Sequence, residues 1–175
     1  MTAASEDRTL IVLRHAETES PHPGQHDLER ALTAQGEQDA RAVGRWLRDH
    51  EIGCDTVLCS PALRTRQTVH EIGSGGCSEA EVVIEQSLYA ADPDDVLQVL
   101  REAPHDASVV MVVAHAPALP VVVSMLAEGA GQADAHDALS KGFPPGAAAV
   151  LRYSGHWSDL GLGTAVLEDY HAPQG

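Results

Sequence analysis

The chain has 175 residues, 43% of them hydrophobic, so it is long enough for a globular domain with a sizeable core and too apolar for a disordered protein. Its 26 acidic residues outnumber the 11 Lys and Arg residues, and the resulting formal net charge of -15 opposes binding to nucleic acid and to anionic membranes. We therefore expect a single domain over residues 1–175, no nucleic-acid or membrane partner, and a local basic cluster wherever an anion binds.

The N-terminal residues and the cysteines indicate a reduced, cytoplasmic protein. Residues 1–8 contain acids and no apolar run, which excludes a signal peptide and predicts a flexible N-terminus. No segment approaches the ~18 consecutive apolar residues of a membrane span. Cys54, Cys59 and Cys77 are an odd set without CxxC spacing, so neither a disulfide framework nor a zinc site is predicted.

The first half of the chain alternates apolar runs with amphipathic segments. Residues 9–13 predict a fully buried strand, and residues 20–31, which are rich in Pro, His and Gly, predict a loop. A helix is predicted from about Thr33, whose hydroxyl suits the N-cap position. The next predicted elements are a strand over 55–60, a helix over 61–76 and a strand over 81–85.

The second half continues this alternation. Asp92 is predicted to cap a helix that has Pro93 at its first position. The remaining predicted elements are a strand over 107–116, a helix over 117–129 with its regular part beyond Pro120, and strands over 146–154 and 163–170. Because apolar strands alternate with helices, we expect an α/β fold, a three-layer α/β/α sandwich with a mostly parallel central sheet.

Cations and imidazoles stand at the ends of the predicted strands. Arg14 and His15 follow the first strand, Arg64 lies in the first turn of the helix after the second, and His115 ends the strand over 107–116. Ligands of open α/β sheets bind beyond the carboxyl ends of the strands, so these residues would converge if the strands are parallel neighbours. Taken alone, a His at a strand end is more often just a polar residue near the surface.

Two arginines and two histidines at one point suit a phosphate dianion, which Arg binds in bidentate fashion. Neighbouring cations lower the pKa of an imidazole, and a neutral His can attack phosphorus through its free lone pair. The cations are supplied by the protein, so we predict no metal and no cofactor. His22 and His26 have i,i+4 spacing but lie in the Pro/Gly-rich loop, which makes them a poor metal pair.

Four segments in order resemble the histidine phosphatase superfamily, which has the phosphoglycerate-mutase-like fold. They are LRHAET at 13–18, LTAQG at 32–36, CSPALRTRQT at 59–68 and VVAHAP at 112–117. The resemblance implies that His15 is the phosphorylated nucleophile and that Arg14, Arg64 and His115 form the phosphate pocket. It also implies that the backbone around Ala116 lies close to the phosphate.

The short chain and the segment DLERALTAQG at 27–36 resemble the SixA-like phosphohistidine phosphatase branch of this superfamily. That resemblance implies that Asp27 and Arg30 border the pocket, although they could also be an ordinary surface ion pair. Ala16 and Ala114 stand where the family usually has Gly, and we expect no loss from either because Ala tolerates a strand conformation.

The position of the family's general acid, usually a Glu, differs in this chain. Mutases and many phosphomonoesterases of the family carry a Glu where this chain has Gln86, and Glu85 is one residue away and so on the opposite face of a strand. An alkoxide leaving group needs a proton from an acid, whereas the imidazole of phosphohistidine leaves far more readily. Glu17, Glu85 and Asp92 remain possible substitutes for the acid.

These observations favour a phosphatase that acts through phosphorylated His15, with phosphohistidine on a protein as the expected substrate. A broad-specificity small-molecule phosphomonoesterase is the alternative enzyme. A third hypothesis is a non-catalytic phosphate-binding module, which would keep the arginines but would not need a competent nucleophile.

Overall fold

The computed structural model describes residues 6–75 and 77–174, and its centre is a six-stranded sheet in the order β3-β2-β4-β1-β5-β6. The strands β3, β2, β4 and β1 are mutually parallel, whereas β5 is antiparallel to β1 and β6 is antiparallel to β5. The strand bounds are β1 Asp7–Arg14, β2 Thr56–Cys59, β3 Glu81–Ile84, β4 Val109–Ala114, β5 Ala148–Ser154 and β6 Ala165–His171.

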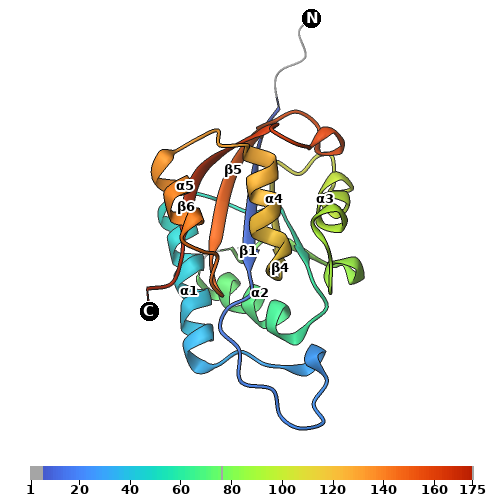
Figure 1. Cartoon of the computed structure of the whole chain (residues 1–175), viewed down its shortest axis with the longest axis vertical. Helices are drawn as coiled ribbons and strands as arrows, with labels where there is room; N and C mark the ends of the chain where they lie inside the picture. The colour runs from blue at the N-terminus through green and yellow to red at the C-terminus, as the bar shows by residue number, and fades with distance from the viewer. Residues whose placement is uncertain (1–5, 76, 175) are drawn as a thin grey trace, which may run out of the picture.

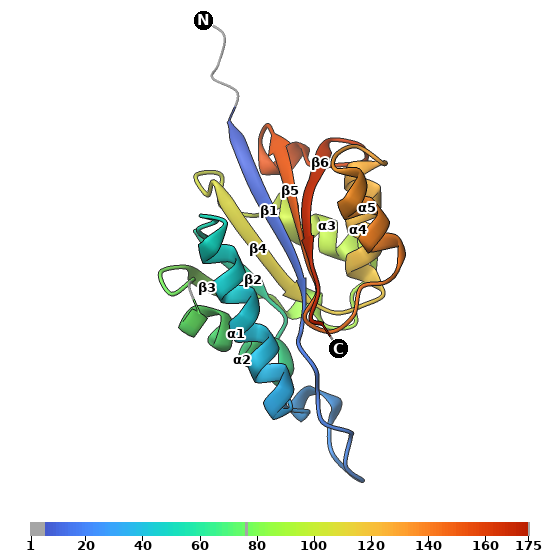
Figure 2. The same cartoon turned by 90° about the vertical axis from the view of Figure 1, so that its left-hand side faces the viewer.

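Helices cover both faces of this sheet, which confirms the predicted three-layer sandwich (Figure 1, Figure 2). α1 and α2 pack on one face, and α3, α4 and α5 pack on the other. The helix bounds are α1 Ala34–Asp49, α2 Leu63–Gly75, α3 Pro93–Arg101, α4 Ala118–Ala127 and α5 Ala133–Ser140. Three 3-10 turns complete the structure: η1 Asp27–Glu29, η2 Gln86–Leu88 and η3 Trp157–Asp159.

The central strands are apolar throughout because both of their faces are buried. Leu10 and Val12 of β1 pack toward α3 and α4, while Ile11 and Leu13 pack toward α1 and α2, and all four side chains are fully buried. Successive side chains of a strand point to opposite faces, so a strand between two helical layers needs an unbroken apolar run. This double burial fixes β1 at the centre of the sheet.

Two predicted helix caps are confirmed. The Thr33 side chain accepts a hydrogen bond from the backbone N–H of Gly36, and this bond satisfies one of the free donors at the start of α1. Asp92 and Asp95 form a reciprocal capping box at the start of α3, with Pro93 in the first turn. Both helices therefore begin where the sequence predicts.

The structure differs from the sequence prediction at the N-terminal segment. Asp7 and Arg8, which were expected to be part of a flexible segment, belong to β1, and residues 1–5 lie outside the described residues. The buried Arg8 guanidinium donates hydrogen bonds to the carbonyls of Ala107 and Gly155, both at 2.6 Å, and lies over the Trp157 ring. These carbonyl bonds tie the beginning of β1 to two loops, a role that the acidic composition of the segment did not indicate.

Two helices also differ from the prediction. α4 begins at Ala118 and so includes Pro120, because the first-turn N–H groups of a helix have no intrahelical partner and Pro loses nothing there. α5 was not predicted, since Ala135 is its only fully buried residue and its apolar periodicity is correspondingly weak. No helix in the described part of the chain is both long and apolar enough to cross a membrane.

Candidate active site

The three predicted strand ends meet at one edge of the sheet. Arg14 pairs with Ala114 across β1 and β4, and Cys59 pairs with Val113 across β2 and β4, so the residues that follow these strands lie level with one another. The backbone N–H of His15 donates to the Ala114 carbonyl at 3.1 Å. The predicted convergence of the parallel strand ends is therefore confirmed.

His15 is held by one ring nitrogen, and the other ring nitrogen has no hydrogen bond to the described residues. The side chain is buried, and its Nδ1 lies 2.8 Å from the carbonyl oxygen of Ala16. A carbonyl oxygen only accepts, so Nδ1 must carry the proton, and the lone pair of the neutral ring is on Nε2. The ring centroid lies 5.4 Å from that of His115, so both imidazoles face the same small space.

The pKa of His15 is lowered to about 4, so its ring is neutral at physiological pH. Burial is the largest cause because it penalises the charged imidazolium, and the charges of Arg64, Arg14 and Arg30 act in the same direction. The hydrogen bond to Ala16 opposes the shift. The sequence argument attributed the lowered pKa to the arginines alone, whereas the structure makes burial the stronger effect.

Arg14 and Arg64 each keep a buried donor without a partner. Arg14 donates through Nη1 to the Phe143 carbonyl at 3.0 Å, and Arg64 donates through Nη1 to the Asp27 carbonyl at 2.8 Å. The Nε–H groups of both arginines are buried and find no hydrogen-bond acceptor among the described residues. Buried donors are nearly always satisfied, so this pair suits a site that an anion enters.

Asp27 and Arg30 form more than a surface ion pair. Asp27 accepts hydrogen bonds from Arg64 Nη2 at 3.0 Å, from the Tyr89 hydroxyl at 2.8 Å and from Arg30 Nη2 at 3.2 Å. Arg30 also donates to the Thr18 hydroxyl at 2.6 Å. The carboxylate of Asp27 thus connects the 3-10 turn η1 to Arg64 at the bottom of the site.

This hydrogen bonding lowers the pKa of Asp27 to about 2, with the Tyr89 hydroxyl as the largest cause and Arg64 as a further one. Asp27 is therefore ionised and cannot serve as a proton donor at neutral pH. The same bond raises the pKa of Tyr89, so its hydroxyl stays protonated. The Tyr89 ring meets the His115 ring edge-on, with centroids 6.0 Å apart.

His115 is anchored between Ser60 and Arg64. Its Nε2 lies 2.7 Å from the Ser60 hydroxyl and its Nδ1 lies 3.4 Å from Arg64 Nη2. The pKa of His115 is lowered to about 3, mainly by burial and then by the charges of Arg64 and His15. Ala116 follows His115 directly in the chain and is half-buried.

Two of the three possible substitute acids, Glu17 and Asp92, are hydrogen-bonded elsewhere. Glu17 accepts a hydrogen bond from the Thr33 hydroxyl at 2.8 Å, and Asp92 caps α3. Glu85 and Gln86 lie at the start of η2, and Gln86 is exposed. Among the described hydrogen bonds, none connects these four side chains to His15 or His115.

Two residues of the motif at 59–68, Gln67 and Thr68, have positions near the site that the sequence did not predict. Thr68 accepts a hydrogen bond from the Ala16 backbone at 3.0 Å, and Gln67 accepts one from the Leu32 backbone at 2.8 Å, so α2 positions the two loops that surround His15. Tyr89 was not predicted to belong to the site, because its contact is with Asp27, which is distant in the sequence. A lone Tyr after a predicted strand gives no signal by itself.

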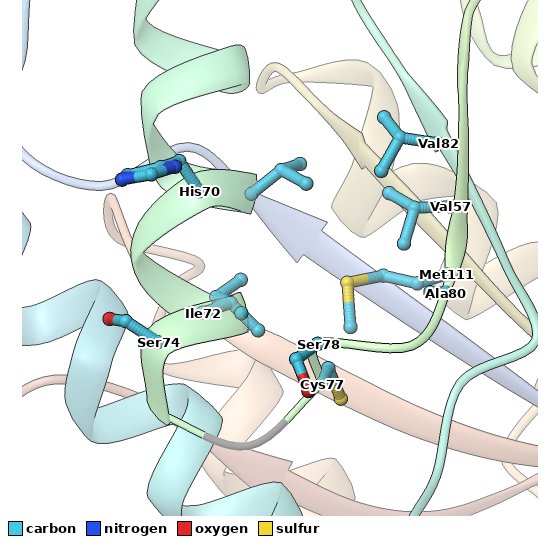
Figure 3. A pocket seen from close by; sticks show the side chains of 11 residues that line it. Val57, His70, Ile72, Ser74, Cys77, Ser78, Ala80, Val82 and Met111 are labelled. Carbon is cyan, nitrogen blue, oxygen red and sulfur yellow. The ribbon is translucent and has the colours of Figure 1, made fainter.

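A mostly apolar cavity lies away from these residues (Figure 3). It has a volume of about 410 Å³ and lies between α2 and the strands β2 and β3. Its lining is mostly apolar, with Ile72 from α2 and Val57, Val82 and Met111 from the sheet. None of the four predicted phosphate-binding side chains borders it, so it is not the phosphate site.

The described residues contain no group of three or more His, Cys, Asp or Glu side chains that could hold a metal ion. His22 and His26, which were considered as a metal pair, are exposed in the loop before and at the start of η1.

Comparison with known proteins identifies the family. A sequence profile described as histidine phosphatase superfamily (branch 1) matches residues 10–89. The structure of a proposed phosphohistidine phosphatase SixA from Nakamurella multipartitia is 36% identical, with a TM-score of 0.84, and the match covers 95% of this chain and 96% of that one. The chain belongs to the histidine phosphatase superfamily. As a member of this superfamily it is an enzyme of the phosphatase class, which its motifs predicted.

A further relative in sequence and a further structural neighbour are consistent with this family and its fold. The phosphohistidine phosphatase SixA of Escherichia coli is 29% identical over 125 residues, which are 69% of this chain and 74% of that protein. The phosphoglycerate mutase of Plasmodium falciparum is 16% identical, with a TM-score of 0.62 and coverage of 95% and 94%, and at that identity the likeness shows the fold alone. The predicted phosphoglycerate-mutase-like fold is confirmed.

Proposed function

We propose that this histidine phosphatase removes phosphate from phosphohistidine on a protein, through a phosphorylated His15 and without a metal ion. The observation that carries the proposal is the hydrogen bond from His15 Nδ1 to the Ala16 carbonyl at 2.8 Å. It fixes the tautomer that leaves a lone pair on Nε2, and the pKa of about 4 keeps that lone pair available at neutral pH.

The reaction has two steps at phosphorus. His15 Nε2 attacks the phosphoryl group, the bond from phosphorus to the substrate nitrogen breaks, and the electron pair leaves with the substrate imidazole. Water then attacks phosphorus, the bond to His15 breaks, and inorganic phosphate is released with the proton passing to solvent. Arg14 and Arg64 would hold the three phosphoryl oxygens, whose charge spreads in the transition state.

The choice of substrate follows from the leaving group. Asp27 is ionised, and Glu17 and Asp92 are bonded elsewhere. No described hydrogen bond connects Glu85 to either imidazole, so these carboxyl groups give little support for an acid that protonates an alkoxide. An imidazole protonated at its second nitrogen leaves as a neutral molecule and needs no such acid. The names of the Nakamurella and Escherichia coli relatives agree with this choice.

One observation favours a phosphomonoesterase as the second candidate. The Tyr89 hydroxyl lies at the edge of the site, its raised pKa keeps it protonated, and its ring contacts His115. A phosphomonoesterase could use this hydroxyl to protonate an alkoxide. In that case Tyr89→Phe would abolish turnover of phosphomonoesters and leave turnover of phosphohistidine unchanged.

The test is phosphate release from a phosphohistidine-bearing protein in the presence of EDTA, with a simple phosphomonoester measured in parallel. We expect release from the phosphohistidine protein, an acid-labile phosphoenzyme in the wild type, and neither of them in His15→Ala. His22→Ala, which changes an exposed loop histidine, is the matched control and should retain full activity.

Three results would contradict the proposal in different ways. Turnover of the phosphomonoester alone would favour the Tyr89-assisted reaction. Loss of activity in EDTA would contradict the metal-independent mechanism. Phosphate binding without a phosphoenzyme would favour the non-catalytic binding module.

A further inference from the structure

The Ser60 hydroxyl is buried against the second imidazole of the site. Ser60 has no exposed surface, and its Oγ lies 2.7 Å from Nε2 of His115, which is its hydrogen-bond partner within the described part of the chain. The backbone of Ser60 is fixed on both sides, because its N–H donates to the Val113 carbonyl and its carbonyl accepts from the Thr65 hydroxyl. The backbone that carries the hydroxyl is therefore held in place, and the hydroxyl proton can rotate about the Cβ–Oγ bond.

His115 must use one nitrogen as a donor and the other as an acceptor. With a pKa of about 3 the ring is neutral and carries a single proton. Nδ1 lies 3.4 Å from Arg64 Nη2, and a guanidinium can only donate. In this arrangement Nδ1 accepts, so Nε2 carries the proton and donates it to the Ser60 oxygen.

A bound phosphoryl group reverses these roles. Its oxygens are acceptors only, and Arg64 would donate to them through the same guanidinium that now faces Nδ1. For His115 to stabilise the phosphoryl group as well, Nδ1 must carry the proton and donate it. Nε2 then becomes an acceptor and needs a donor, and Ser60 is the side chain in hydrogen-bond contact with it.

We propose that Ser60 is a positioning residue that allows His115 to change tautomer when a phosphoryl group binds. In the unliganded site Ser60 accepts from Nε2–H, and in the liganded site it rotates and donates to Nε2, while Nδ1–H points to a phosphoryl oxygen. The proton balance is neutral: one proton leaves Nε2 for water and another is added at Nδ1 from water. The inference rests on the proposed function, because it takes the phosphoryl group as the ligand of this site.

The role requires a group that can both accept and donate, which a hydroxyl can do and a methyl cannot. Ser60→Ala would remove the hydrogen-bond partner that Nε2 has among the described residues, and the Nδ1–H form would then have an unsatisfied buried acceptor. Ser60→Thr keeps the hydroxyl. This pair of variants separates the hydrogen bond from the packing of the side chain.

The experiment is nuclear magnetic resonance of protein with 15N-labelled histidine, in which two-bond proton–nitrogen correlations distinguish the two tautomers. The His115 signal is assigned by its loss in His115→Asn. Spectra are recorded at pH 7 with and without inorganic phosphate, for the wild type, Ser60→Ala, Ser60→Thr and the control Ser74→Ala. Ser74 makes a hydrogen bond to the Glu71 carbonyl in exposed surroundings on α2.

We expect wild-type His115 to have its proton on Nε2 without phosphate and on Nδ1 with it. In Ser60→Ala the change should be absent or incomplete, and the rate of phosphoenzyme formation should fall about tenfold, the effect of losing one buried hydrogen bond. Ser60→Thr should restore the tautomer change, and Ser74→Ala should match the wild type in both measurements.

A wild-type His115 that keeps one tautomer in both states would overturn the inference, even if Ser60→Ala failed to fold. An unchanged tautomer switch in Ser60→Ala would overturn it as well. The spectra need only inorganic phosphate, so failure of the proposed function is seen separately, as a wild type that switches tautomer but does not hydrolyse phosphohistidine.

Discussion

The three nitrogens of the Arg64 guanidinium differ in their hydrogen-bond partners within the protein. Nη1 of Arg64 is bonded to the Asp27 carbonyl and Nη2 to the Asp27 carboxylate, while the buried Nε finds no acceptor among the described residues. Asp27 therefore fixes the plane of the guanidinium and leaves its Nε–H available for the proposed phosphoryl ligand. A guanidinium that is held in this way needs little reorganisation when phosphate arrives.

Arg64→Ala should lower kcat/KM by roughly 10²-fold or more, by analogy with removal of one preorganised donor in other enzymes. The matched control is Arg66→Ala, because Arg66 lies on the same helix, is exposed, and donates to the Pro61 carbonyl, away from the site. Steady-state kinetics with the phosphohistidine protein gives both values. An equal loss of kcat/KM in the two variants would show that activity depends on the positive charge of α2 and not on the position of Arg64.

The buried imidazoles also make stability depend on pH. The pKa values of His15 and His115 are lowered from about 6.5 to about 4 and about 3, so the unfolded chain binds more protons than the folded chain between these limits. The free energy of unfolding should therefore be highest above pH 6.5 and should decrease as the pH falls from about 6.5 toward 4.

Urea denaturation of the wild type and of His15→Gln at pH 7.5 and pH 5.0 measures this effect. The wild type should lose more stability between the two pH values than the variant, since Gln does not titrate. An equal loss in both proteins would mean that the pKa of His15 is not lowered by folding. The rings are 5.4 Å apart, so the apparent pKa values belong to the pair.

At the scale of secondary-structure elements, α1 and α2 are positioned by a close backbone contact at Gly44. In the sequence this residue is only an isolated glycine. α1 and α2 lie side by side on one face of the sheet (Figure 2). A Cβ added to Gly44 of α1 would collide with the Ile72 carbonyl of α2 and would lie 3.0 Å from the Cα of Gly75. Backbone atoms cannot rotate away as a side chain can, so these helices approach closely only because Gly44 has no side chain.

Gly44→Ala should therefore destabilise the protein by about 1–3 kcal/mol, the usual cost of overpacking, and should shift α2, which carries Arg64. Gly73→Ala is the matched control, because a Cβ at this helical position meets nothing within 4 Å. The control should be neutral or more stable by about 0.5–1 kcal/mol. The stabilities of the two variants are compared by the midpoints of their urea denaturation curves. Equal midpoints would contradict close α1–α2 packing.

Elements with an unbroken apolar run or a strong cap could be predicted from the sequence, and the others could not. β1 and β4 were predicted because both of their faces are buried, and α3 was predicted from Asp92 and Pro93. α5 was not predicted, because Ala135 is its only buried residue and the segment therefore has little apolar periodicity. The same holds in the site: strand ends identify His15 and His115, but the contact of Tyr89 with Asp27 joins residues 62 positions apart.

At the scale of the whole molecule, the net charge of -15 opposes the approach of any anionic substrate. The arginines of the site attract phosphate only at short range, whereas at low ionic strength the field of the acidic surface extends about 30 Å. We therefore expect kcat/KM for a small phosphorylated anion to rise severalfold as salt is increased from about 10 to 100 mM.

The measurement uses two potassium salts with different anions, because an anion that competes for the arginines would lower the rate and an inert one would not. Parallel increases in both salts would indicate screening of the acidic surface. A turnover that increased as salt was lowered would show that the local cations dominate the approach, and the electrostatic argument would be wrong.

The direction in which β1 runs determines which end of the chain can be used to attach this enzyme to a surface. Its eight residues, at about 3.3 Å each, separate Asp7 from the catalytic edge by some 26 Å. The opposite end of the chain returns toward that edge, since Pro173 lines a cavity together with Glu17, two positions after His15. An affinity handle or a fused reporter placed before residue 6 would lie far from the active face and leave it open to the proposed protein substrate, whereas one placed after residue 174 would begin close to that face.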